Sequence, residues 1–144
     1  MLKLDRDTRV LAVQYVRRYD KYRVRLAAER NAILHRSPAP PDGQPRSSIQ
    51  GDPTARAAEA LDRLNNGHMA QVIRAVDAAV LEVGSDMCSE QAVSALRKAI
   101  WTSCLSDHTY AYEVSADMLP VSRASFYRRK NEFLRSVAER VETF

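Results

Sequence analysis

Apolar residues recur at helical spacing through most of the chain. From Asp5 to His35 the sequence has no proline or glycine. One stripe in this segment follows steps of four, four, three, four and seven residues: Leu11, Tyr15, Tyr19, Tyr22, Leu26 and Ile33. Such spacing places a stripe on one side of an α-helix. A helix of this length extends about 45 Å, so we expect it to protrude and to pair with another helix, from the same subunit or a second one.

A segment of a different kind separates this helix from the next. Residues 37–52 contain four prolines, two glycines and three serines, and proline lacks the N–H that a helix interior needs. We therefore expect a linker. Asp52 followed by Pro53 is typical of a helix start. Helical spacing then continues, weakened at Asn65-Asn66-Gly67, to an expected stop at Gly84.

One more core helix is predicted after Ser89, a residue type that caps helix starts. Its apolar positions are Val93, Leu96, Ile100, Trp101, Cys104 and Leu105. We expect a buried thiol at Cys104, and two cysteines do not make a disulfide framework. The predicted fold is all-α, with a basic helical arm at 1–36, a linker at 37–52, and a helical domain at 53–144.

The net charge of +4 is unevenly distributed. Residues 1–36 hold ten Lys and Arg against four Asp and Glu, residues 37–121 hold six against eleven, and residues 122–144 hold six against three. Two basic ends around an acidic middle favour contact with a polyanion through particular elements. Ordinary solvent-exposed helix faces also carry such charges. A sequence motif is therefore needed to distinguish a polyanion-binding surface from a solvated one.

The C-terminal sequence supplies such a motif, a helix-turn-helix at about 108–141. This motif needs a small residue where its helices meet, an apolar residue that closes the first helix, and another after the turn. Ala116, Leu119 and Val121 meet these needs in order. Ser122 follows as the expected N-cap of the second helix. Pro120 biases the residue before it away from helix, so the first helix should end at or before Met118.

The second helix has two distinct sides when it is rotated by about 100° per residue. Phe126, Phe133 and Val137 lie on the apolar side, with Leu134 at its margin. The opposite side would face the major groove, where Arg128 could read guanine and Asn131 adenine. The small side chains of Ala124 and Ser125 would allow the helix to approach the base edges closely. The flanking residues would contact phosphates, and they are Arg123, Tyr127, Arg129 and Lys130. The whole predicted DNA-binding set is Ser122, Arg123, Ala124, Ser125, Tyr127, Arg128, Arg129, Lys130, Asn131 and Arg135.

Two stretches of the sequence resemble phage late-gene transcription regulators of the ArpU and RinA kind. One is the segment Ser37-Pro-Ala-Pro-Pro-Asp-Gly43 with the following Gly51-Asp-Pro-Thr-Ala55, and the other is Val121-Ser-Arg-Ala-Ser-Phe-Tyr-Arg-Arg-Lys130, which is also similar to the DNA-reading helix of sigma factor region 4. The resemblance implies an activator of phage or prophage genes that binds double-stranded DNA and acts with host RNA polymerase. Separately from the resemblance, we expect a homodimer that forms through the N-terminal helix and reads paired half-sites on DNA.

Other classes of function have less support in the sequence. The three histidines are scattered, and no phosphate loop, nucleophile elbow or metal-ligand spacing appears, so we expect no enzyme, cofactor or metal. No apolar run approaches the ~18 residues of a membrane span, and we expect a cytoplasmic, nucleoid-associated protein. Two alternatives stay open: a packaging protein of the small-terminase kind, which usually carries its DNA-binding module first, and a helical adaptor that binds protein.

Overall fold

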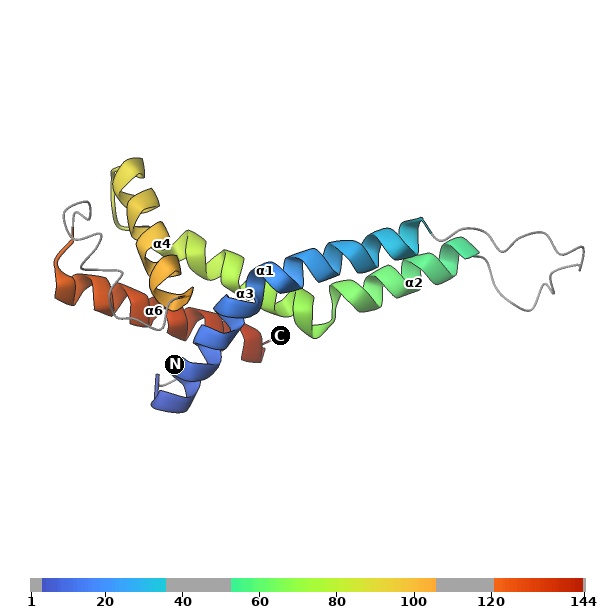
Figure 1. The fold of residues 1–144 in the computed structure, drawn as a ribbon, viewed down its shortest axis with the longest axis horizontal. Helices are drawn as coiled ribbons and strands as arrows, with labels where there is room; N and C mark the ends of the chain where they lie inside the picture. Colours follow the sequence, from blue (N-terminus) through green and yellow to red (C-terminus); the bar gives the residue numbers. More distant parts are fainter. Residues whose placement is uncertain (1–3, 36–52, 106–120, 144) are drawn as a thin grey trace, which may run out of the picture.

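The computed structural model describes residues 4–35, 53–105 and 121–143. This part of the chain forms helices and no strand, so the all-α prediction is confirmed. Figure 1 shows a body on the left and a two-helix arm on the right. The helices are α1 (Arg6–Leu34), α2 (Pro53–Asn65), α3 (His68–Glu82), α4 (Glu90–Leu105) and α6 (Arg123–Thr143).

Local capping sets the helix bounds close to the predicted positions. The N–H of Thr8 donates to the Asp5 carboxylate at 2.7 Å, which starts α1. The N–H of Ala92 donates to the Ser89 hydroxyl at 3.3 Å, which starts α4. The weakened stretch before residue 68 is a full break, because Gly67 is extended and serves as the N-cap of α3.

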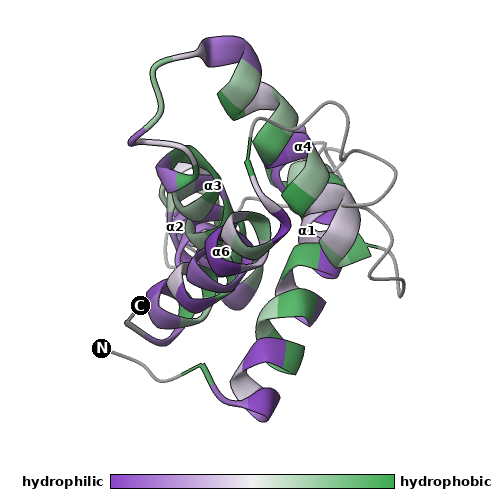
Figure 2. Cartoon of the chain, turned by 90° about the vertical axis from the view of Figure 1, so that its left-hand side faces the viewer, coloured by the Kyte–Doolittle hydropathy of each residue, from purple (hydrophilic) through white to green (hydrophobic). Residues whose placement is uncertain are grey.

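The core lies where α6 packs between α1 and α3 (Figure 2). The first half of α1 belongs to this body, since Ala12 and Val16 are fully buried. The second half of α1 leaves the body and packs along α2, as Figure 1 shows. None of the helices in the described ranges is long and apolar enough to span a bilayer.

The predicted stripe of α1 packs against helices of the same chain. Tyr19 meets the ring of Trp101 edge-on at 5.2 Å, and Tyr15 and Tyr22 both meet His68. Leu26 is buried. The first member of the stripe, Leu11, lies at its edge and is 38% exposed. The partner of this stripe is therefore intramolecular, and a second subunit would have to use another surface.

The turn after α3 depends on a glycine. Gly84 has φ +75°, a conformation that residues with a Cβ rarely adopt. A Cβ added there would lie 3.0 Å from Cγ2 of Val93 in α4. The predicted stop at Gly84 is thus confirmed, and the same residue allows α4 to approach the end of α3.

We predict that Gly84→Ala lowers the free energy of unfolding by about 1–3 kcal/mol, because it adds left-handed backbone strain and a contact with Val93. Urea denaturation measures the change. Gly67→Ser is the matched control: Gly67 has φ −77°, and serine at this N-cap should be neutral or stabilising by a few tenths of a kcal/mol. Equal destabilisation by the two substitutions would contradict the argument.

Candidate nucleic-acid interface

The start of α6 is fixed by Ser122, as predicted. The N–H of Ser125 donates to the Ser122 hydroxyl at 3.2 Å, and the N–H of Phe126 donates to its carbonyl at 2.8 Å. The bond to the hydroxyl satisfies an amide that the first turn of a helix leaves without a backbone partner, and the bond to the carbonyl is the first backbone bond of the helix. The helix therefore begins at Arg123, and its first two turns hold most of the predicted DNA-binding residues.

The apolar side of α6 is buried in the core, which anchors the helix. Phe126 is fully buried, and Phe133 is 3% exposed. Leu134, expected at the margin, is also fully buried because α6 is covered by both α1 and α3. Val121 packs against the same core just before the helix.

The opposite side of the first turns is open to solvent. Arg123, Ala124 and Arg128 are exposed, and Ser125 is half-buried. Within the described residues Arg128 donates no hydrogen bond, whereas the guanidinium of Arg123 lies 5.8 Å from the ring centre of Tyr127. The start of α6 therefore presents Arg123 and Arg128 to solvent, with the small, exposed Ala124 between them.

Further along the helix, two predicted residues are less accessible than expected. Asn131 and Arg135 are both half-buried, and the Nε atom of Arg135 is buried. This placement follows from the packing of α6 between two helices instead of on one. Arg128 is therefore the base-reading candidate that remains exposed.

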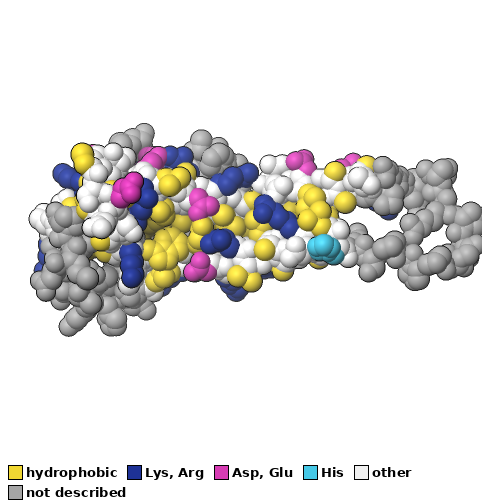
Figure 3. All heavy atoms as spheres, turned by 90° about the horizontal axis from the view of Figure 1, so that it is seen from above, with side chains coloured by type: hydrophobic (Ala, Val, Ile, Leu, Met, Phe, Trp, Pro, Cys, Tyr) yellow, Lys and Arg dark blue, Asp and Glu magenta, His cyan; other side chains and the backbone are white. Residues whose placement is uncertain are grey.

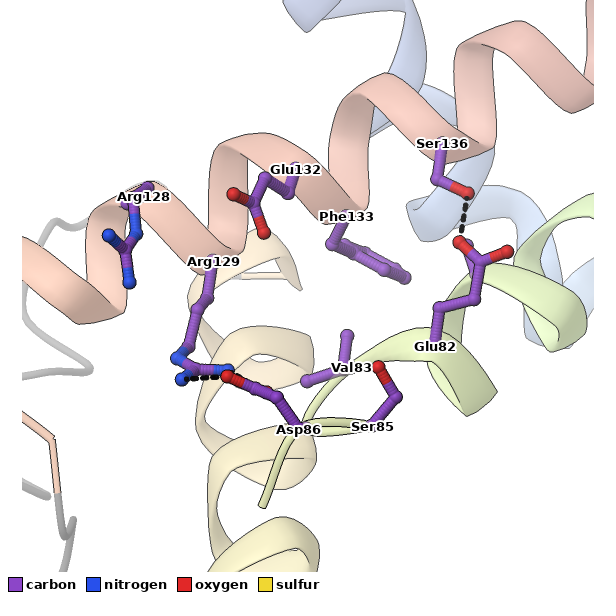
Figure 4. A pocket seen from close by; sticks show the side chains of 11 residues that line it. Glu82, Val83, Ser85, Asp86, Arg128, Arg129, Glu132, Phe133 and Ser136 are labelled. Atoms are coloured by element: carbon purple, nitrogen blue, oxygen red, sulfur yellow. Dashed lines mark hydrogen bonds and ion pairs between the residues drawn. The ribbon is translucent and has the colours of Figure 1, made fainter.

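Arg129 is engaged within the protein, which the sequence did not indicate. Its guanidinium donates two hydrogen bonds to the carboxylate of Asp86, at 2.8 and 3.0 Å (Figure 4). These bonds lower the pKa of Asp86 and raise that of Arg129. A bidentate pair of this kind fixes geometry as well as adding energy. Arg129 thus ties α6 to the turn between α3 and α4 instead of lining an exposed flank.

The expected exposed position of Lys130 is wrong. Its side chain is half-buried, and its Nζ donates to the hydroxyl of Ser103 at 2.7 Å. Nearby, Nε of Arg17 donates to the carbonyl of Cys104 at 3.1 Å. Both cations lie at the C-terminal end of α4, where the helix dipole favours positive charge. Burial lowers the pKa of Lys130 and raises that of Cys104 to about 11.

The reason for this burial is present in the sequence. Lys130 comes four residues after Phe126 and three before Phe133. That spacing puts all three residues on one side of the helix, so Lys130 lies on the apolar side. The predicted burial of Cys104, its neighbour across the interface, is confirmed.

A hollow of about 390 Å³ lies beside the exposed start of α6. The turn at Gly84–Asp86 forms one wall, and Arg128 and Glu132 of α6 reach the other (Figure 4). Beyond Glu132 the exposed face of the helix continues with the acidic Glu142. Arg135 and Arg140 also lie in this part of α6, but both are half-buried and Arg140 is paired with Glu82. The exposed positive charge of α6 is therefore concentrated in its first turns.

The first helix of the predicted helix-turn-helix, with Ala116 and Leu119, lies outside the described residues. In the described ranges, no three His, Cys, Asp or Glu side chains are grouped to hold a metal ion. Comparison of the chain with protein-family models, curated proteins and solved structures found no match.

We predict that Lys130→Met changes how stability depends on pH. Because the pKa of Lys130 is lowered in the folded state, the wild-type protein should gain stability as pH rises from that pKa to the ordinary value of 10.5. The variant lacks this gain. In urea denaturation, the free energy of unfolding of the wild-type protein minus that of the variant should therefore be larger near pH 10.5 than at neutral pH.

The matched control is Lys98→Met, at an exposed position of α4. This variant keeps Lys130, so its unfolding free energy should rise over this pH range as that of the wild-type protein does. An equal rise for Lys130→Met would show that the buried position of this lysine does not affect its ionisation.

Proposed function

We propose that the protein is a sequence-specific transcription regulator that inserts the first turns of α6 into the major groove of double-stranded DNA. The observation that carries the proposal is the position of Arg128. Its side chain is exposed on a helix whose opposite side is anchored by the fully buried Phe126. A rigid helix that presents an arginine is the geometry by which many proteins read guanine.

The surroundings of Arg128 support a groove-reading role. Ala124, one turn earlier, is small and exposed, so the helix could approach base edges closely. Arg123 and Tyr127 flank this position and could contact phosphates, which give affinity without sequence information. The bidentate pair of Arg129 with Asp86 holds the same turns against the body, and accurate readout needs such support.

The acidic continuation of α6 restricts the orientation of the helix on DNA. Glu132 follows Arg128 by one turn on the exposed face, and Glu142 lies near the C-terminal end. Phosphates would be repelled along this part of the helix. The arrangement therefore favours entry by the N-terminal end, which is how recognition helices commonly enter the groove.

The resemblance to ArpU and RinA regulators gives the proposal its biological form. We extend it to an activator of phage or prophage late genes that acts with host RNA polymerase as a homodimer. A packaging protein of the small-terminase kind would share DNA binding, whereas an adaptor would not bind DNA. Selection of binding sites from a random duplex library tests the common part of the proposal first.

We predict that Arg128→Ala weakens binding to the selected site by about 1–3 kcal/mol and relaxes base preference at one position. Fluorescence anisotropy with the selected duplex and its single-base variants measures both effects. Arg56→Ala, which removes an exposed arginine from α2 in the arm, is the matched control and should leave base preference unchanged. If the two substitutions weaken all duplexes alike, Arg128 does not read a base.

We also predict that Glu132→Gln strengthens binding to any duplex, because it removes a negative charge one turn from Arg128. The gain should shrink as salt rises, since exposed charges are screened. Glu142→Gln makes the same change at the far end of α6 and should have a smaller effect. Titrations at two salt concentrations compare them. A larger gain for Glu142→Gln would reverse the proposed orientation of α6 on DNA.

A further inference from the structure

The hollow beside α6 has the size and the walls of a small-molecule site. Its volume of about 390 Å³ lies within the usual range for such sites. One wall is the turn that follows α3, and the other is a side of α6 (Figure 4). Val83 is 8% exposed and Phe133 is 3% exposed, and both line the hollow between these walls. Its floor is therefore apolar. Figure 3 shows that charged side chains surround apolar ones over much of the body.

Polar bonds link the two walls of the hollow at both ends. At one end the guanidinium of Arg129 donates to both carboxylate oxygens of Asp86. At the other end Glu82 accepts a hydrogen bond from the hydroxyl of Ser136 at 2.9 Å and pairs with Arg140. A site held in this way exists before a ligand arrives, so little binding energy is lost in ordering it.

Two charged side chains that line the hollow are left over from this pairing. Among the described residues, Arg128 donates no hydrogen bond, Glu132 accepts none, and neither forms an ion pair. They lie one turn apart, with the cation before the anion, which is the less favourable order for pairing within a helix. The carboxylate of Asp86 also attracts Arg128, but it already accepts two hydrogen bonds from Arg129. The hollow thus presents one cation and one anion to a ligand.

We propose that the hollow binds a free α-amino acid with a small apolar side chain. Such a molecule carries a carboxylate and an ammonium group on one carbon atom. Its carboxylate accepts from Arg128, and its ammonium group donates to Glu132. Four residues of helix rise about 6 Å, so one amino acid can contact both side chains. The apolar side chain of the ligand then covers Val83 and Phe133 and leaves water.

Simpler ligands match the hollow less well. A phosphate or another anion would bind Arg128 but would also face the carboxylates of Glu132 and Asp86. An amine would bind Glu132 and leave Arg128 without a partner. The exposed parts of Val83 and Phe133 are small, so a side chain of the size of valine or leucine is enough to cover them. The charges and the floor together favour a small apolar amino acid.

This site has a consequence that rests on the proposed function. Arg128 lines the hollow and also belongs to the side of α6 that would read DNA. When its guanidinium binds the carboxylate of an amino acid, it is no longer available to a guanine. By linkage, the amino acid and DNA weaken each other's binding by the same factor. The proposed regulator would therefore leave its DNA site as the concentration of the amino acid rises.

Saturation-transfer NMR of the full chain without DNA tests the site, with L-leucine as the probe. Two analogues each lack one charge: 4-methylpentanoate has no ammonium group, and 3-methylbutylamine has no carboxylate. Each should bind at least about tenfold more weakly than L-leucine, because one charged side chain then loses its partner. Glycine, which lacks the apolar side chain, should also bind more weakly. The proposal is overturned if L-leucine does not bind at up to about 10 mM, or if either analogue binds as tightly.

Substitutions test where the amino acid binds. Arg128→Ala and Glu132→Gln should each weaken binding of L-leucine at least about tenfold in the same NMR titration. Arg56→Ala and Glu59→Gln make the same changes at exposed positions of α2 and should leave the affinity unchanged. Equal weakening by the α2 substitutions would place the bound amino acid elsewhere and overturn the proposal.

Fluorescence anisotropy with the selected duplex tests the link to DNA. Saturating L-leucine should weaken DNA binding by the wild-type protein about fivefold or more, and it should have little effect on Glu132→Gln, which binds it poorly. If L-leucine and DNA bind without affecting each other, Arg128 does not hold the carboxylate and the proposed site is wrong. The NMR titration contains no DNA. Its failure therefore leaves the DNA-binding proposal standing, and a protein that binds L-leucine but no duplex would overturn only that proposal.

Discussion

The packing of α6 between α1 and α3 is the constraint on which the rest of the structure depends. Phe126 and Leu134 are fully buried between two helices, so α6 can neither rotate nor slide without opening the core. Close-packed interiors resist such shifts because each lost contact costs dispersion and hydrophobic energy. This packing determines which side of α6 remains outside, and hence that Arg128 and Ala124 face solvent.

The basic residues of the chain divide into two groups, and total charge does not separate them. One group donates hydrogen bonds to backbone carbonyls of the protein itself. Arg97 donates to the carbonyls of Leu81 and Val83 at the end of α3, and Arg17 donates to the carbonyl of Cys104 at the end of α4. Such bonds satisfy the carbonyls that every helix leaves open at its C-terminus. The other group, which includes Arg128, remains exposed. Only this second group bears on contact with an external polyanion.

Local signals in the sequence were sufficient to predict the helices. Ser89 and Ser122 cap the helices they were expected to cap, because a cap acts over three residues and leaves a visible pattern. The candidate site was predicted less completely. The pairing of Arg129 with Asp86 joins residues 43 apart in sequence, and nothing local indicates it. The burial of Lys130, in contrast, could have been predicted locally. Its spacing from Phe126 places it on the apolar side of α6, whereas the prediction of exposure relied on its charge alone.

The two sides of α1 differ in how clearly the sequence indicates them. The inner stripe is rich in tyrosine and packs against α3 and α4, so it gives a strong periodic signal. The outer side contains alanine and asparagine between Val24 and Leu34, so its periodic signal is weak. The same helix thus builds the body with one side and leaves the other side exposed along the arm.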